Sequence, residues 1–202
     1  MYINILIFQA AIMAARKNKK YVDSESFERA SERVLAGLEK KIMSSDLEKK
    51  TVAIHESGHA IMHWMLEGGS PLLKVTIVPR SKGMLGFAQF LPNENSLDSK
   101  EELFDKLCCM LGGRVAEEML LGEITTGATD DLQKVYDLSK NMVVRFGMSE
   151  KLGYMAFKED DFTKIYSEST GNMIDDEIRE LARKATEKCR EMIASHRNQI
   201  ER

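Results

Sequence analysis

The 202-residue sequence has little proline, little cysteine and no excess of charge of either sign. Only 3 residues are Pro, so long helices can form without interruption. Lys+Arg number 29 and Asp+Glu 32, and the net charge of −3 gives no reason to expect nucleic acid as a partner. The three cysteines are an odd number, and Cys108 and Cys109 are adjacent, so we expect a reducing compartment and, with Cys189, thiols packed in the core.

Long apolar runs are also lacking. The segment 1–15 is mostly apolar, but a membrane-spanning helix needs about 20 residues. The basic residues 16–20 follow this segment, which is the reverse of the order in a secretory signal. We therefore expect a core helix at 1–15 and a soluble, helix-rich globular chain.

The apolar periodicity predicts long helices and one hairpin. Helices are expected at 3–15, 23–38, 45–67, 99–121, 130–146 and 172–200, with a charged connector at 39–50. The β-branched and aromatic runs 75–78 and 85–91 flank a loop with glycine at 79–84, which predicts two antiparallel strands. The predicted fold class is mainly α (α+β), a helical domain with a small antiparallel β-hairpin beside the helix 45–67.

The segment His55-Glu56-Ser57-Gly58-His59 fits the pattern H-E-x-x-H. This spacing puts two imidazoles one helical turn apart, so both can reach one Zn²⁺ at about 2.0–2.1 Å. Glu56 lies about 100° round the helix, where its carboxylate can take the proton of an attacking water as catalytic base. The alternative is an amphipathic helix whose core histidines are hydrogen-bonded. His63 lies about 80° off the stripe of His55 and is expected to be a partly exposed surface histidine.

A catalytic zinc needs three protein ligands and one open position, so a third ligand must come from another element. Asp130 and Asp131 begin the helix 130–146, where either carboxylate could simply cap the helix. Asp131 shares the apolar stripe of that helix, whereas Asp130 falls on its polar face. An aspartate that points at the core is destabilising unless it is paired or bound to a metal, so we predict Asp131 as the third ligand.

Glu117 and Glu118 compete with Asp131 for this role, because they lie on the buried stripe of the helix 99–121. Arg114 shares their stripe and can neutralise one of them as an ion pair. All three residues are more consistent with contacting the ligands than with binding the metal itself.

Five ordered blocks extend the motif: 52–60 (VAIHESGHA), 74–80 (KVTIVPR), 111–118 (LGGRVAEE), 125–132 (TTGATDDL) and 146–153 (FGMSEKLG). Together they resemble the proteolytic part of the FtsH-type AAA metalloproteases, the M41 peptidases. The residues in these blocks most resemble those of the mitochondrial, matrix-facing branch of the family. The resemblance implies a zinc metalloendopeptidase with one Zn²⁺ per chain, His55, His59 and Asp131 as metal ligands and Glu56 as catalytic base.

The family hydrolyses unfolded or membrane-extracted polypeptides after ATP-driven unfolding, in protein quality control, as a membrane-anchored homo- or hetero-hexamer. For this chain the resemblance implies the end of a helical AAA lid at 1–38 and a zinc peptidase domain at 39–202, with a truncated final helix. It places the parent protein in the mitochondrial inner membrane, facing the matrix, with the bacterial cytoplasmic membrane or a plastid as alternatives.

The sequence lacks G-x-x-x-x-G-K-[ST], the motif that binds nucleotide phosphates. No nucleotide-binding residue is therefore predicted, and ATP is expected only in an ATPase module outside this chain. Membrane anchoring is likewise expected only through segments absent here.

An exposed strand edge beside the metal helix could pair with the main chain of a substrate, and the candidate residues are Val75, Thr76, Ile77 and Val78. The competing hypothesis is a catalytically silent, zinc-containing assembly module that forms the protease ring. A structural zinc has four protein ligands, whereas a catalytic zinc keeps one position open. The intact Glu56 favours the enzyme.

Overall fold

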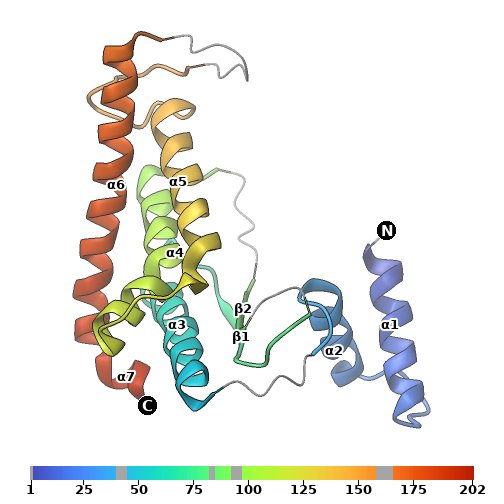
Figure 1. The fold of residues 1–202 in the computed structure, drawn as a ribbon. Coiled ribbons are helices and arrows are strands. Elements are labelled where there is room, and N and C mark those ends of the chain that lie inside the picture. The colour runs from blue at the N-terminus through green and yellow to red at the C-terminus, as the bar shows by residue number, and fades with distance from the viewer. Residues whose placement is uncertain (1, 40–44, 82–84, 92–96, 158–165) are drawn as a thin grey trace.

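The computed structural model describes residues 2–39, 45–81, 85–91, 97–157 and 166–202 (Figure 1). In chain order its elements are α1 (Tyr2–Arg16), α2 (Ser24–Leu35), α3 (Asp46–Met65), β1 (Leu72–Thr76), β2 (Phe87–Phe90), α4 (Lys100–Leu121), the 3-10 helix η1 (Thr126–Ala128), α5 (Thr129–Val144), α6 (Glu168–Ser195) and α7 (Arg197–Glu201). Long helices with one two-stranded antiparallel sheet confirm the predicted fold class. None of the described helices is both long and apolar enough to cross a bilayer.

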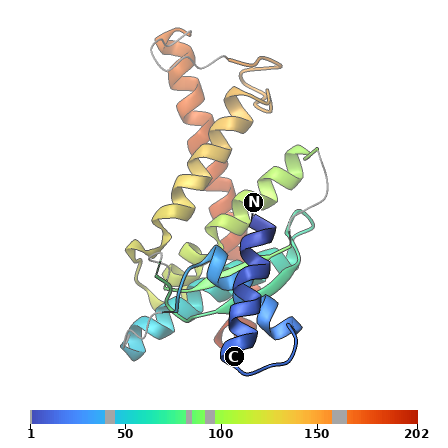
Figure 2. The ribbon, with the colours of Figure 1, turned by 90° about the vertical axis from the view of Figure 1, so that its right-hand side faces the viewer.

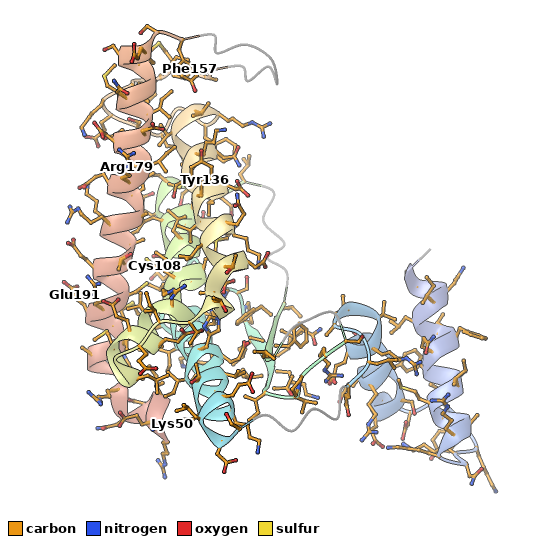
Figure 3. The ribbon with its side chains drawn as sticks, viewed as in Figure 1. Lys50, Cys108, Tyr136, Phe157, Arg179 and Glu191 are labelled. Atoms are coloured by element: carbon orange, nitrogen blue, oxygen red, sulfur yellow. The ribbon has the colours of Figure 1, made fainter. Side chains whose placement is uncertain are left out.

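Helix α4 lies at the centre of a bundle, where it packs against α3, α5 and α6 (Figure 1). Its buried face continues the core between α3 and α6 and includes Leu107, Cys108 and Val115. The thiol of Cys189 in α6 donates to the backbone oxygen of Cys108 at 3.2 Å. Figure 3 labels Cys108 within the bundle. The three cysteines are free and buried, as the sequence predicts.

Serine caps fix where the central helices begin. The Ser45 hydroxyl accepts from the backbone N–H of Glu48 at 3.1 Å and starts α3. Ser99 and Glu102 form a capping box at the start of α4, in which each side chain accepts from the other residue's backbone N–H. Such Ser-x-x-Glu patterns satisfy the first helical N–H groups, so these starts match the sequence prediction.

Helices α1 and α2 pack on one another and stand apart from the bundle (Figure 1). Figure 2 views the molecule from their side, with α1 in front. The expectation of a core helix at 1–15 is wrong, because Ile3 and Phe8 of α1 are 72% and 64% exposed. One face of α1 packs on α2, and Ala10 and Ala14 on this face are buried. No described element of the bundle covers the opposite face of α1.

The attachment of α2 to the hairpin region is made by charge and by backbone hydrogen bonds. The buried Glu32 of α2 accepts from Arg80 Nη2 at 2.7 Å and pairs with Lys74 of β1. Farther along, the backbone N–H of Ser81 donates to the oxygen of Leu38 at 2.8 Å. The connection between the two strands therefore also holds the N-terminal helices.

Strands β1 and β2 pair antiparallel, with Thr76 opposite Phe87 and Leu72 opposite Phe90, and the register shifts between Leu72 and Lys74. The predicted first strand, 75–78, is wrong in its bounds, because β1 covers 72–76 and Ile77 and Val78 follow it. The backbone N–H of Val78 donates to the Thr76 hydroxyl at 3.2 Å, and Pro79 has no backbone N–H. Neither residue can therefore donate to β2, and the ladder ends at Thr76. Parts of the predicted loop 79–84 and connector 39–50 lie outside the described residues.

The C-terminal helix is divided, although the sequence predicted one helix over 172–200. Ser167 caps α6 at its start, and the helix ends at Ser195. His196 separates α6 from α7, and its Nδ1 lies 2.9 Å from the oxygen of Met192.

Candidate metal centre

The site begins with the crossing of α3 and α4, where glycines let the two backbones meet. A Cβ on Gly112 would lie 2.7 Å from the backbone oxygen of Gly58, and a Cβ on Gly58 would lie 2.7 Å from Ala116 Cβ. Gly113 lies beneath the two motif histidines, since a Cβ there would be 2.6 Å from both His55 Cε1 and His59 Nε2. The imidazoles therefore rest directly on the backbone of α4.

Each motif histidine is oriented through its Nδ1. His55 Nδ1 donates to Glu117 Oε1 at 2.7 Å, and His59 Nδ1 donates to the backbone oxygen of Cys109 at 2.8 Å. A carboxylate and a carbonyl only accept, so these contacts place the ring proton on Nδ1 and leave the lone pair on Nε2. The two Nε2 atoms face one another at 3.1 Å.

Asp131 completes the group from the first turn of α5. Its Oδ2 lies 3.4 Å from His55 Nε2 and 3.3 Å from His59 Nε2. Tetrahedral zinc with bonds of about 2.0–2.2 Å sets its ligand atoms about 3.3 Å apart, so these three atoms fit one zinc ion. Asp130 points away, with a side chain that is 81% exposed against 19% for Asp131. No other such cluster occurs in the part of the chain that the structure describes.

The electrostatics of the cluster favour a cation at its centre. Burial by itself would raise the pKa of Asp131, but its contacts with His55 and His59 hold that pKa well below its usual range. Burial lowers the pKa of His55, and the carboxylates of Asp131 and Glu117 on either side of its ring outweigh this effect and raise that pKa. Two lone pairs and a carboxylate directed at one point repel one another unless a positive charge lies between them.

Glu56 lies beside this group with a 9% exposed side chain, and burial raises the pKa of its carboxyl. No residue of the described ranges hydrogen-bonds its carboxylate. The segment that leads into β2 packs against it, since a Cβ on Gly86 would lie 2.5 Å from Glu56 Oε1. Neither Gly86 nor Gly113 was predicted from the sequence as a residue of the site. The pair Gly112-Gly113 inside a helix was the one available signal, because glycine there is destabilising unless a close approach requires it.

The structure separates the residues predicted to support the ligands. Glu117 is 1% exposed, bonds His55 and accepts from the backbone N–H of Thr125 at 2.8 Å, which joins α4 to the segment before α5. Glu118 is exposed and pairs with Arg190 of α6, so it lies outside the site. Arg114 is partly buried and forms no ion pair with either glutamate in the described structure, contrary to expectation.

His63 does not face the cluster. Its ring stacks on Phe90 with centroids 3.6 Å apart, and its Nδ1 accepts from the backbone N–H of Ser70 at 3.0 Å. Burial lowers its pKa to about 4. The predicted surface histidine therefore joins α3 to β2. Of the substrate-strand candidates, Val75 and Thr76 lie in β1 and Ile77 and Val78 beyond it.

The described residues form a mainly helical protein with one candidate metal centre. The two histidines of the H-E-x-x-H helix and an aspartate from a following helix make up this centre. Residues 42–202 match the model described as Peptidase family M41, and the chain belongs to this family, as the resemblance implied.

Named relatives agree with this membership. "ATP-dependent zinc metalloprotease FTSH 8, mitochondrial" of Oryza sativa subsp. japonica is 50% identical over 95% of this chain and 24% of its own length. "Mitochondrial inner membrane m-AAA protease component AFG3L1" of Mus musculus is 50% identical over 96% of this chain and 25% of its own length. "ATP-dependent zinc metalloprotease FtsH" of Rhodothermus marinus is 45% identical over 96% of this chain and 29% of its own length. The chain thus spans about a quarter of the length of these relatives.

Proposed function

We propose that this chain is the peptidase part of a zinc-dependent endopeptidase that hydrolyses peptide bonds of unfolded or membrane-extracted polypeptides. The observation that carries the proposal is the convergence of His55 Nε2, His59 Nε2 and Asp131 Oδ2 beside the buried carboxylate of Glu56. Three ligand atoms leave one position of a tetrahedral ion open, which is typical of catalytic zinc. The names of the relatives, which include zinc metalloproteases, agree with it.

Zinc bound by these three residues would supply a Lewis acid that polarises the scissile carbonyl and lowers the pKa of water. Glu56 takes the proton of the attacking water and delivers it to the leaving amine, a role that suits a carboxylate whose pKa burial has raised. Glu117 and the backbone oxygen of Cys109 hold the imidazoles of His55 and His59 in the tautomer that directs Nε2 at the metal.

For the whole protein we propose an ATP-driven unfoldase joined to this peptidase in a hexameric ring at the mitochondrial inner membrane, facing the matrix. Relatives carry the words ATP-dependent and mitochondrial inner membrane in their names. The bacterial relative keeps a bacterial membrane open as the alternative. Residues 1–38 would then be the end of the lid and 39–202 the peptidase domain, with a substrate lying along the hairpin near Val75 to Val78.

The test compares zinc content and cleavage of casein by the wild-type chain and by Glu56→Gln. We expect both proteins to retain zinc, while the variant loses at least about a hundredfold in kcat because the proton acceptor is gone. Equal cleavage by both would remove Glu56 as the base. Zinc in both with cleavage by neither would favour the silent assembly module.

A second experiment tests the third ligand by comparing Asp131→Asn with Asp130→Asn. The Asp131 variant is expected to lose zinc, because Oδ2 of Asp131 faces both Nε2 atoms. The Asp130 variant serves as the matched control, since its exposed carboxylate pairs with Lys134. Loss of zinc from the Asp130 variant alone would overturn the assignment.

A further inference from the structure

Among the residues that the structure describes, only packing fixes the direction of the Glu56 carboxylate. In the described part of the chain no donor hydrogen-bonds the Glu56 carboxylate, although the residue is buried and only 9% exposed. A glutamate has three side-chain torsions, so without a hydrogen bond its carboxylate would sample several directions. A base that must reach a water within about 3 Å requires something else to confine it.

That confinement comes from the backbone immediately before β2. A Cβ on Gly86 would lie 2.5 Å from Glu56 Oε1, 2.7 Å from Glu56 Cγ and 2.6 Å from Val52 Cγ1. Val52 lies one turn before Glu56 on α3, so the glutamate side chain is enclosed between its own helix and the Gly86 backbone. Two contacts hold this backbone in place, namely the pairing of Phe87 with Thr76 and the stacking of Phe90 on His63.

We propose that Gly86 is a positioning residue of the hydrolysis, whose bare backbone forms the wall that keeps the Glu56 carboxylate directed at the attacking water. The inference rests on the proposed function of Glu56 as the base. Any side chain at position 86 would occupy the volume of the carboxylate. The Glu56 side chain is flexible, so it would move and the fold would remain.

Two other glycines of the site would respond differently to the same change. A Cβ on Gly113 meets His55 and His59, so Gly113→Ala is expected to displace the metal ligands. A Cβ on Gly112 meets the backbone of α3, which cannot move locally, so Gly112→Ala is expected to destabilise the fold. Gly171 in α6 offers a neutral control, because the nearest atom to its added Cβ is 3.4 Å away in Tyr166.

The experiment makes Gly86→Ala, Gly113→Ala and Gly171→Ala in the full chain and measures zinc content, Tm, kcat and KM on casein. Gly86→Ala should keep its zinc and its Tm, lose about a hundredfold in kcat and change KM by less than about twofold, as expected for a misplaced base. Gly113→Ala should lose zinc, and Gly171→Ala should match the wild type. Adding Val52→Ala to Gly86→Ala makes room for the carboxylate and should restore at least about tenfold in kcat.

A wild-type kcat in Gly86→Ala would overturn the proposal. So would a loss of zinc or of Tm as large as that in Gly113→Ala, since Gly86 would then serve the fold. Crystal structures of the wild type and of the Gly86→Ala variant keep the proposal testable if the zinc-loaded wild type cleaves nothing and the proposed function fails. Displacement of the Glu56 carboxylate in the variant would support the proposal, and an unmoved carboxylate would overturn it.

Discussion

The crossing of α3 and α4 and the attachment of α2 to the hairpin region are held by different forces. At the crossing, Gly58 and Gly112 bring two backbones into contact with no space for a methyl group. At the attachment, Glu32 meets Arg80 and Lys74 through charge, and the pairing is confined to a few side chains. Steric contact sets positions to fractions of an ångström, whereas ion pairs tolerate small displacements and respond to pH. The candidate metal centre therefore lies where position is fixed most closely.

The largest effect is expected at the crossing. Gly58→Ala puts a methyl group within 2.7 Å of Ala116 Cβ and against the backbone of Gly112, and neither helix can move without disturbing the core. We expect a loss of roughly 3 kcal/mol in the free energy of unfolding, measured by denaturant titration. Gly171→Ala is the matched control, and an equal, small effect of both variants would contradict the comparison.

A smaller effect is expected at the attachment. Glu32→Ala removes the closer of the two carboxylates that pair with the buried Arg80 guanidinium and leaves only Glu39 Oε1, at 3.5 Å from Nη1. This loss should weaken the docking of α2 by about 2 kcal/mol. Hydrogen exchange of the α2 amides should accelerate accordingly, while zinc content stays unchanged. Glu25 on the same helix pairs at the surface with Lys17, Lys19 and Arg29, so Glu25→Ala should change little. Equal exchange rates in the two variants would show that charge does not hold α2.

Glu117→Gln tests whether the candidate metal centre depends on charge, as the attachment of α2 is expected to do. The amide can still contact His55 Nδ1 but carries no charge, so we expect a loss of about tenfold in zinc affinity, or about 1.4 kcal/mol. Competition with a chromogenic chelator measures the affinity. Glu118→Gln is the control, because Glu118 lies outside the site and pairs with Arg190. Unchanged affinity in Glu117→Gln would mean that the hydrogen bond to His55 suffices and that the charge of Glu117 adds nothing to zinc binding.

The smallest effect concerns pH and the contact between α3 and β2. Burial lowers the pKa of His63 to about 4, below the value of about 6.5 in the unfolded chain, so the unfolded state binds the proton more tightly. Stability is therefore full above about pH 6.5 and falls as the pH decreases, by about 1 kcal/mol at pH 5.5. His63→Phe keeps a ring against Phe90 and should lose less stability between about pH 7.5 and 5.5. Identical losses in the two proteins would show that His63 does not contribute.

Local signals made most of the fold predictable. The 3.6-residue periodicity placed α3, α4 and α5 close to their observed bounds, and the structure begins α3 and α4 directly after Ser45 and Ser99. The same periodicity separated Asp131 from Asp130, and the structure directs Asp131 at His55 and His59. These predictions succeeded because each depends on residues within a few turns of one helix.

The rest depends on contacts between distant segments. Nothing near Gly86 in the sequence shows that it meets Glu56, 30 residues earlier. The apolar composition of 1–15 predicted burial, but in the described structure α1 packs chiefly on α2. The bounds of β1 were wrong because the ladder with β2 starts at Leu72, in a segment that reads as a turn after Pro71. Tertiary pairing decided each of these cases over local preference.

The backbone oxygen of Cys109 has a consequence for substitution studies of this family. It accepts from His59 Nδ1 in the interior of α4, so the partner of a candidate metal ligand belongs to the main chain. Replacing the Cys109 side chain leaves this acceptor in place, and an alanine scan of α4 would pass over it without a signal. Part of the centre is thus encoded by the path of a helix and is open to mutation only through changes that bend or shift that helix.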